Sequence, residues 1–374
     1  MNILVTGAEG FIGKNLCIKI NENKEFNLLK FTRKNSKNEL KDLLKISDFI
    51  IHLAAVNRTS KLNDFKKSNE NLTKLICDIL LQSKKKIPII FTSSSHVKNL
   101  KRQKHADYVK SKLKCESILE QLSIKNQNPV IIYRLKGIFG KWCKPNYNSV
   151  VATFCNNIAN NSEIKIHNLN DKVELVHVDH VIKSFLKNIT NKKLKDFSLI
   201  DTPKYQSISV LDLAKIIKSF KSSQQNLEIE RVGKGFVRSL YSTYLTYIPE
   251  SKFIYDIPKY SDQRGNFVEI IKTKDSGQIS YFTIEPGKIR GGHYHHTKTE
   301  KFIVMRGKAL FYSKNILTKE ECKWKVCGTK PQVIETIPGW AHNIKNIGND
   351  EVIVMLWASE KFDKKNPDTY FYEL

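Results

Sequence analysis

The first 200 residues alternate short apolar runs with stretches in which apolar side chains recur every three or four positions. Short apolar runs are typical of strands buried on both faces, and the longer spacing is typical of helices that cover a sheet. The alternation therefore predicts an α/β domain with a doubly wound parallel sheet. We expect strands at Ile3–Val5, Leu28–Phe31, Phe49–Leu53, Ile87–Phe91 and Val130–Tyr133, and helices at 11–22, 62–83, 107–123 and Leu211–Phe220.

From about residue 260 the pattern changes to short strands of alternating apolar and polar residues, separated by Gly, Pro and Asn turns. This pattern predicts an all-β unit, a barrel or jelly roll. The stretch 246–260 contains Pro249 and Pro258 and is the expected linker, so the domains are predicted at 1–245 and 261–374. The expected strands of the second domain are Phe267–Ile271, Ile279–Ile284, Phe302–Met305, Ala309–Tyr312, Val333–Ile337 and Val352–Trp357.

The length of 374 residues fits two domains, and the net charge of +26 raises nucleic acid as a partner. Residues 261–374 hold 18 basic and 14 acidic side chains, which leaves +22 for residues 1–260. Only nine of the 63 basic residues are arginines, and the basic stretches lack the interleaved aromatic residues of a single-strand platform. We therefore interpret the charge as a solvated, lysine-rich surface and expect no nucleic acid partner.

The chain has no run of eighteen apolar residues, so no membrane span is expected. Met1–Val5 lead directly into a glycine-rich turn without a basic leader or a small-residue cleavage site, unlike a signal peptide. The seven cysteines are scattered and form no CxxC pair, as expected for reduced thiols. Together these features predict a cytoplasmic protein.

A glycine-rich turn, Thr6-Gly7-Ala8-Glu9-Gly10-Phe11-Ile12-Gly13, follows the first predicted strand and opens a helix. Glycines at this spacing allow a tight turn and let the backbone approach a pyrophosphate at the helix N-terminus, which predicts a dinucleotide site. The second strand ends in Phe31-Thr32-Arg33-Lys34, with two cations and no carboxylate. This favours the 2′-phosphate of NADPH over NAD, with Arg33 as its bidentate ligand.

Tyr108 and Lys112 lie four residues apart, on one face of a predicted helix. An adjacent ammonium is expected to lower the phenol pKa from its usual ~10, so that Tyr108 can exchange a proton with a carbonyl oxygen as hydride arrives. The hydroxyl-rich run Phe91-Thr92-Ser93-Ser94-Ser95 ends the fourth predicted strand.

With the glycine turn, these residues resemble the extended short-chain dehydrogenase/reductase family over about residues 1–245. The resemblance implies a Rossmann-like fold, Tyr108 as acid, Lys112 as its helper and Ser94 as the hydroxyl that orients the substrate carbonyl, with Ser93 and Ser95 still open. Only 14 positions separate Ser94 from Tyr108, so the loop over the nicotinamide is expected to be short. The cofactor site that it implies comprises Gly7, Gly10, Phe11, Ile12, Gly13, Arg33, Leu53, Ala54, Ala55, Tyr108 and Lys112.

Four of the ten histidines lie between 293 and 342. The segments that contain them, 287–300 with Gly307 and 338–342 with Asn346, resemble the two motifs of the cupin family. His293 and His295 alternate along a strand, and Glu300 and His342 are expected on neighbouring strands. Three imidazoles and a carboxylate suit Zn, Fe, Mn or Ni, and we expect zinc. A metal-free cupin remains the alternative. His296 points to the other face and either binds substrate or caps the turn.

The segment 262–269 resembles the strand that opens the barrel in nucleotide-sugar epimerases, which implies that Arg264 contacts a nucleotide diphosphate, with Arg290 as a second candidate. In full, the chain resembles the CapF-type bifunctional capsular polysaccharide synthesis enzymes, in which an extended reductase is fused to a cupin. The resemblance implies a homodimer on the route to UDP-N-acetyl-L-fucosamine. It also implies that the cupin epimerises C3 of a UDP-2-acetamido-2,6-dideoxy-4-hexulose and that the reductase then reduces C4 with NADPH.

Elementary chemistry supports this order, because the C3 proton is acidic only while C4 is a ketone. The acid or base of the cupin stays open, with His296 and Tyr294 as candidates. Two alternatives remain: a nucleotide-sugar 4-epimerase or dehydratase that retains NAD, and an NADPH-sensing module that binds nucleic acid with steep salt dependence.

Overall fold

The computed structural model describes the chain apart from residues 58–64, 99–105, 167 and 192. The chain forms two compact units, residues 1–217 with 239–248 and residues 218–238 with 249–374. Residues 218–238, expected in the first domain, belong to the second unit, as do residues 249–260 of the expected linker. The reason is that the short strand β10 (Glu228–Ile229) pairs with strand β12 (Gly265–Thr273).

The first unit is built on a six-stranded sheet in the order β2-β1-β3-β4-β5-β8, and all of its strand pairs are parallel. The predicted doubly wound sheet is therefore confirmed. Its strands are β1 (Asn2–Thr6), β2 (Asn27–Phe31), β3 (Phe49–His52), β4 (Ile89–Ser94), β5 (Val130–Leu135) and β8 (Phe197–Asp201). A smaller sheet holds β6 (Gly137–Phe139), β7 (Lys172–His177) and β9 (Gln206–Ser209).

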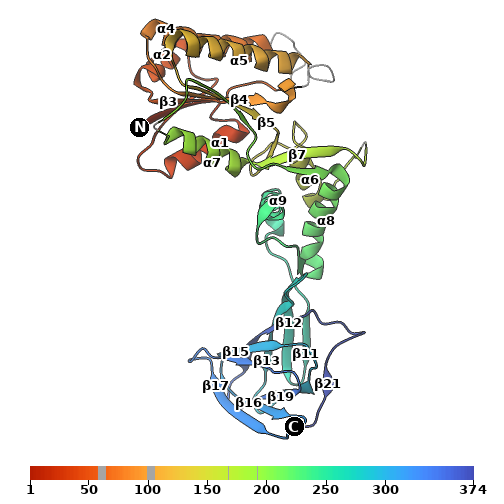
Figure 1. Ribbon diagram of the computed structural model, residues 1–374. Coiled ribbons are helices and arrows are strands. Elements are labelled where there is room, and N and C mark those ends of the chain that lie inside the picture. The colour runs from red at the N-terminus through yellow and green to blue at the C-terminus, as the bar shows by residue number, and fades with distance from the viewer. Residues whose placement is uncertain (58–64, 99–105, 167, 192) are drawn as a thin grey trace. The chain divides into compact units, whose positions relative to one another are not determined.

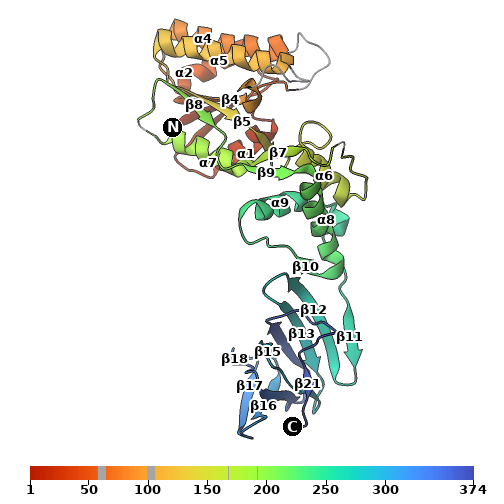
Figure 2. The same cartoon turned by 45° about the vertical axis from the view of Figure 1, so that its right-hand side comes forward.

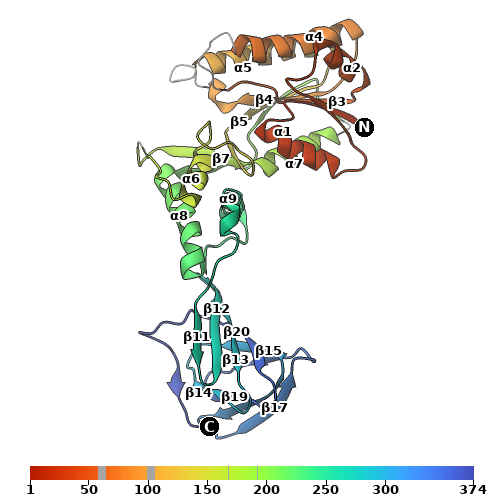
Figure 3. The same cartoon turned by 180° about the vertical axis from the view of Figure 1, so that it is seen from behind.

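Helices cover both faces of this sheet (Figures 1 and 3). Alternate strand residues point to opposite faces, so Ile3 and Val5 pack with α1 and α7, whereas Leu4 packs with α2, α4 and α5. The helices and helical turns are α1 (Phe11–Asn21), α2 (Lys37–Ile46), η1 (Lys66–Glu70), α4 (Asn71–Ser83), η2 (Ser95–Lys98), α5 (Ala106–Asn126), α6 (Val150–Ala159), α7 (Val178–Ile189), α8 (Val210–Asn226), α9 (Gly235–Leu245) and η4 (Glu250–Lys252).

The second unit contains two sheets, in the orders β10-β12-β13-β20-β15-β18 and β17-β16-β19-β14-β21, with β11 beside β12 (Figure 2). Their strand pairs are antiparallel except for the parallel pair of β10 and β12. Phenylalanine, isoleucine and valine side chains from both sheets form one buried core, which confirms the expected cupin barrel. Its remaining strands are β11 (Lys259–Asp262), β13 (Gln278–Ile284), β14 (Ile289–Tyr294), β15 (Glu300–Arg306), β16 (Lys308–Asn315), β17 (Glu321–Cys327), β18 (Val333–Glu335), β19 (Trp340–Asn346), β20 (Val352–Ala358) and β21 (Tyr370–Phe371).

Within the described part of the chain, every helix is too short or too polar to span a lipid bilayer.

Candidate functional site

The glycine turn lies between β1 and the first turn of α1. Gly10 is the N-cap of α1 and offers no side-chain hydrogen bond, so the amide groups of the first helical turn are left for a ligand. Gly7 has φ +70°, and a Cβ there would lie 2.7 Å from the backbone nitrogen of Ala54. A Cβ on Gly13 would lie 2.2 Å from the Gly7 oxygen. The backbone of this turn is therefore packed closely enough to approach a bound pyrophosphate, and Ala54 lies next to the turn.

Buried polar side chains hold the segment that follows β3 next to the glycine turn. The Thr6 hydroxyl lies 2.7 Å from Nδ1 of His52 and accepts a hydrogen bond from the Ala54 N–H at 3.3 Å. His52 Nε2 lies 2.9 Å from the Thr73 hydroxyl, and burial lowers the pKa of His52 to about 3. The neutral imidazole thus connects β1, β3 and α4 and holds the segment that contains Leu53, Ala54 and Ala55.

Arg33 and Lys34 follow β2 and are exposed. The turn that carries them is closed by Asn35, whose side-chain oxygen accepts the N–H of Thr32 at 2.8 Å. No ion pair within the described ranges engages Arg33, so its guanidinium is free to bind an anion beside the glycine turn.

Tyr108 and Lys112 lie one turn apart on α5, as predicted. The Lys112 ammonium donates to the Thr92 carbonyl at 2.8 Å, lies 4.6 Å from the Phe91 ring centroid and 6.0 Å from that of Tyr108. The predicted lowering of the Tyr108 pKa is wrong, because burial raises that pKa to about 12 and lowers the pKa of Lys112 to about 8. Tyr108 is therefore protonated at neutral pH and suited to donate a proton.

The three candidate serines lie where β4 ends. Ser93 and Ser94 are buried, and Ser95 begins η2. The Ser94 hydroxyl accepts the N–H of His96 at 3.2 Å, whereas Ser93 Oγ has no hydrogen-bond partner among the described residues. Part of the expected short loop between Ser94 and Tyr108, residues 99–105, lies outside the described residues.

The four predicted metal ligands converge in the cupin barrel. The ligand atoms of His293, His295, Glu300 and His342 all lie within 4.8 Å of one another. Two details differ from the prediction: His295 follows the end of β14, and Glu300 lies on β15 in the sheet opposite to β14 and β19. The cluster therefore bridges the two sheets of the barrel.

Hydrogen bonds orient the imidazoles of this cluster. Nδ1 of His295 lies 2.6 Å from the Asp368 carbonyl, and Nδ1 of His342 lies 3.4 Å from the Trp340 carbonyl, so both Nε2 atoms face Glu300 at 3.2 and 3.3 Å. His342 Nε2 is buried, and apart from its 3.3 Å approach to Glu300 it has no hydrogen-bond partner in the described part of the chain. Burial also lowers the pKa of His293 to about 3, which keeps its lone pair free. These residues fit a divalent metal ion.

Burial raises the pKa of the Glu300 carboxyl, but the facing His295 and His342 outweigh it and hold that pKa below its ordinary value. Glu300 is thus ionised, as a ligand must be.

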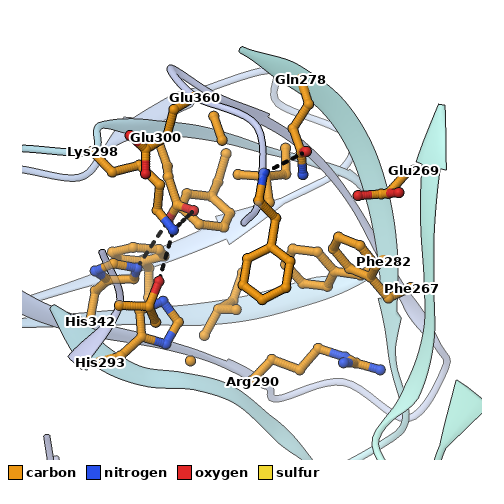
Figure 4. A pocket seen from close by; sticks show the side chains of 18 of the residues that line it. Phe267, Glu269, Gln278, Phe282, Arg290, His293, Lys298, Glu300, His342 and Glu360 are labelled. Atoms are coloured by element: carbon orange, nitrogen blue, oxygen red, sulfur yellow. Dashed lines mark hydrogen bonds and ion pairs between the residues drawn. The ribbon is translucent and has the colours of Figure 1, made fainter. Parts of the chain in front are cut away.

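A cavity of about 360 Å³ opens beside the cluster (Figure 4). Aromatic side chains, including Phe267 and Phe282, form much of its wall, and Arg264 and Arg290 lie on its lining. Both guanidinium groups face the Asp262 carboxylate, Arg264 Nη2 at 2.6 Å and Arg290 Nη2 at 3.4 Å. The two arginines predicted to bind substrate therefore meet at one place in the barrel.

His296 and Tyr294 are not among the residues that line this cavity. His296 is exposed and packs against Tyr294 and Tyr370, with ring centroids 5.5 and 4.7 Å apart. The structure therefore places the two candidates for acid or base away from the cavity.

Sequence reasoning missed three residues around the cluster: Lys298, Glu360 and Asp368. Lys298 is only 8% exposed, lines the cavity and donates to the Thr369 hydroxyl at 2.9 Å. Its position within the histidine motif 287–300 could have identified it from the sequence. Glu360 and Asp368 lie far along the chain in a polar segment with no recognisable spacing.

Comparison with known proteins identifies the family of this chain. Residues 3–199 match the NAD dependent epimerase/dehydratase family, and residues 260–370 match the polysaccharide biosynthesis C-terminal domain. The chain belongs to the NAD dependent epimerase/dehydratase family.

Within this family, the chain is 46% identical over 372 residues to a UDP-2-acetamido-2,6-beta-L-arabino-hexul-4-ose reductase of Pseudomonas aeruginosa, covering 99% of this chain and 98% of the relative. The crystal structure of the capsular polysaccharide assembling protein CapF from Staphylococcus aureus has 36% identity and a TM-score of 0.91, with 100% of both chains covered. The resemblance to CapF-type enzymes is thus confirmed. A UDP-glucuronic acid 4-epimerase from Bacillus cereus shares the fold of the first part, at 18% identity, 66% and 98% coverage and a TM-score of 0.57.

Proposed function

We propose that this chain is a bifunctional nucleotide-sugar enzyme of surface polysaccharide synthesis, which reduces the C4 ketone of a UDP-linked 2-acetamido-2,6-dideoxy-4-hexulose with NADPH. The observation that carries the proposal is the pairing of a protonated Tyr108 with a buried Lys112 near the end of a doubly wound sheet. The Pseudomonas relative, a reductase of such a 4-ketosugar, supports the substrate class.

NADPH supplies the hydride when bound. In the proposed reduction, Tyr108 gives its phenolic proton to the ketone oxygen, and the Lys112 ammonium favours the phenolate that remains. Ser94 orients the ketone. The backbone of Gly7, Gly10 and Gly13 holds the pyrophosphate, and Arg33 holds the 2′-phosphate.

We further propose that the barrel epimerises C3 of the same sugar before reduction. The order follows from chemistry, because only the 4-ketone makes the C3 proton acidic. Arg264 and Arg290 would bind the diphosphate, in exchange for their contacts with Asp262. His293, His295, Glu300 and His342 would hold a zinc ion, whose Lewis acidity would favour charge on the ketone oxygen.

The two activities are separable by mutation. Tyr108→Phe is expected to abolish NADPH oxidation and to leave exchange of the C3 proton with deuterated solvent intact. His293→Ala is expected to impair that exchange much more than the reduction of an already epimerised ketosugar. Retained reduction in Tyr108→Phe would refute the role of Tyr108, and equal loss of both activities in His293→Ala would refute separate sites.

Stoichiometric NADPH consumption also tests the reductase assignment, since a 4-epimerase or dehydratase that retains its nicotinamide cofactor shows no net consumption. We propose a homodimer in the cytoplasm, on the resemblance to CapF-type enzymes. Sedimentation at equilibrium measures the first, and cell fractionation the second.

A further inference from the structure

Three carboxylates line the barrel cavity, and they differ in their partners. Glu269 pairs with the Lys272 ammonium at 2.8 Å. Glu300 faces the histidines of the metal cluster. Glu360 alone has no hydrogen bond or ion pair to its carboxylate within the residues that the structure describes. An unengaged carboxylate has all of its lone pairs available to a ligand.

The backbone on both sides of Glu360 is anchored. The Ser359 N–H donates to the Thr299 carbonyl at 2.9 Å, and the Thr299 N–H donates to the Ser359 hydroxyl at 3.0 Å. The Phe362 N–H donates to the side-chain oxygen of Gln278 at 3.1 Å. The partly buried Glu360 is thus held at the cavity although it lies in a loop.

The strand pairing explains why Glu360 lies near the metal cluster. β20 ends at Ala358, which lies opposite Glu300 in the β15–β20 ladder. Glu360 follows two residues later, and Figure 4 shows it on the same side of the cavity as Glu300 and Lys298. A free carboxylate and a buried ammonium therefore lie on one side of the cavity, next to the cluster that would receive the ketone.

We propose that Glu360 is the base that removes the C3 proton in the epimerisation, an inference that rests on the proposed function of the barrel. The C3–H bond breaks and the proton passes to a carboxylate oxygen of Glu360. The released electron pair forms the C3–C4 double bond, and the C4–O π electrons move to oxygen as an enolate. The Lys298 charge favours that enolate. A water proton added to the opposite face of C3 completes the inversion, and Glu360 returns its proton to solvent.

The experiment follows deuterium incorporation at C3 by NMR, with UDP-2-acetamido-2,6-dideoxy-4-hexulose in deuterated water. Glu360→Gln keeps the shape of the side chain and removes the base, so the exchange rate is expected to fall roughly 100-fold or more. Glu360→Asp retains a base one methylene shorter and is expected to restore part of the rate. Glu335→Gln is the matched control, because Glu335 is exposed and pairs with Lys301 outside the cavity.

Two further measurements exclude a structural effect of Glu360→Gln. The metal content of the variant and its rate of NADPH-dependent reduction of an epimerised ketosugar are both expected to equal those of the wild type. Exchange within about threefold of the wild-type rate would overturn the role of Glu360 and leave epimerisation standing. A 100-fold loss in Glu269→Gln instead would assign the base to Glu269 and also overturn the proposal. If the metal-loaded wild type shows no exchange, the proposed epimerase function itself is refuted.

Discussion

Replacing Asp368 with alanine tests how the C-terminal segment supports the metal cluster. The Asp368 carboxylate accepts the backbone N–H groups of His296 and Thr297 at 2.9 Å and of Lys298 at 2.8 Å, as well as the Thr297 hydroxyl at 3.0 Å. Its carbonyl oxygen lies 2.6 Å from Nδ1 of His295. One residue thus holds the turn that follows His295, one of the four proposed metal ligands.

The expected loss of stability depends on how exposed the three backbone N–H donors are. A hydrogen bond to a charged acceptor contributes about 1.5–3 kcal/mol to stability. His296 and Thr297 are exposed, so their amides can turn to water, whereas the buried Lys298 amide loses its partner outright. We therefore expect Asp368→Ala to lower the free energy of unfolding of the barrel by about 2–3 kcal/mol.

The same contacts predict a pH dependence. Burial raises the pKa of Asp368, but the three backbone N–H groups outweigh it and hold that pKa well below its ordinary value. The contribution to stability is therefore present in full above the unfolded pKa of about 3.9 and is lost as the pH falls further.

Urea unfolding of metal-free protein at pH 7 measures the stability, and competition with a chromogenic chelator measures zinc affinity. Zinc affinity is expected to fall about 10- to 100-fold, because the variant keeps the carbonyl oxygen at residue 368 but loses the carboxylate contacts that hold this oxygen against His295. Asp363→Ala is the matched control, since the side chain of the exposed Asp363 accepts the Lys365 N–H at 2.9 Å, a contact remote from His295 in the chain. If Asp368→Ala and Asp363→Ala behave alike, the turn is held by other contacts and the reasoning is refuted.

Three other predictions concern the reductase unit. Gly13→Ala would place a methyl carbon 2.2 Å from a backbone oxygen, so we expect a loss of about 1–3 kcal/mol in stability and no NADPH binding by fluorescence titration. Because the pKa of Lys112 is about 8, the rate of NADPH oxidation is expected to fall as the pH rises through about 8. Lys112→Arg should remove this fall, because arginine keeps its charge at that pH and Tyr108 stays protonated. Glu116→Gln breaks the bidentate ion pair with Arg134, whose two contacts are 3.2 and 2.6 Å long. We expect the free energy of unfolding in urea to fall by about 2–3 kcal/mol, and an unchanged value would refute a structural role for the pair.

The features that sequence predicted well are those encoded over short spans. The spacing of Gly7, Gly10 and Gly13 determines a tight turn and a helix start, and the structure has both. Tyr108 and Lys112 share a helix face because four residues make about one turn. The alternation of apolar runs and helical periods predicted the parallel sheet, since both periodicities are local properties of the chain.

The protonation of Tyr108 was decided by tertiary structure. The neighbouring ammonium suggested a lowered pKa, but the ammonium is engaged by the Thr92 carbonyl, and burial raises the pKa instead. Burial depends on every element packed around the residue, and no spacing along the chain reports it.

The sequence by itself indicated two domains, a glycine-rich dinucleotide turn and the four residues of the proposed metal site, His293, His295, Glu300 and His342. Only the fold brought Glu300 across from the opposite sheet, the Asp368 carboxylate to the N–H groups of residues 296–298, and Glu360 to the cavity. The physical reason is that these contacts join residues 58 to 73 positions apart (Ala358 opposite Glu300, Asp368 against His295) through strand pairing and loop anchoring. The ladder and the packing of the whole barrel set such contacts, and local patterns do not encode them.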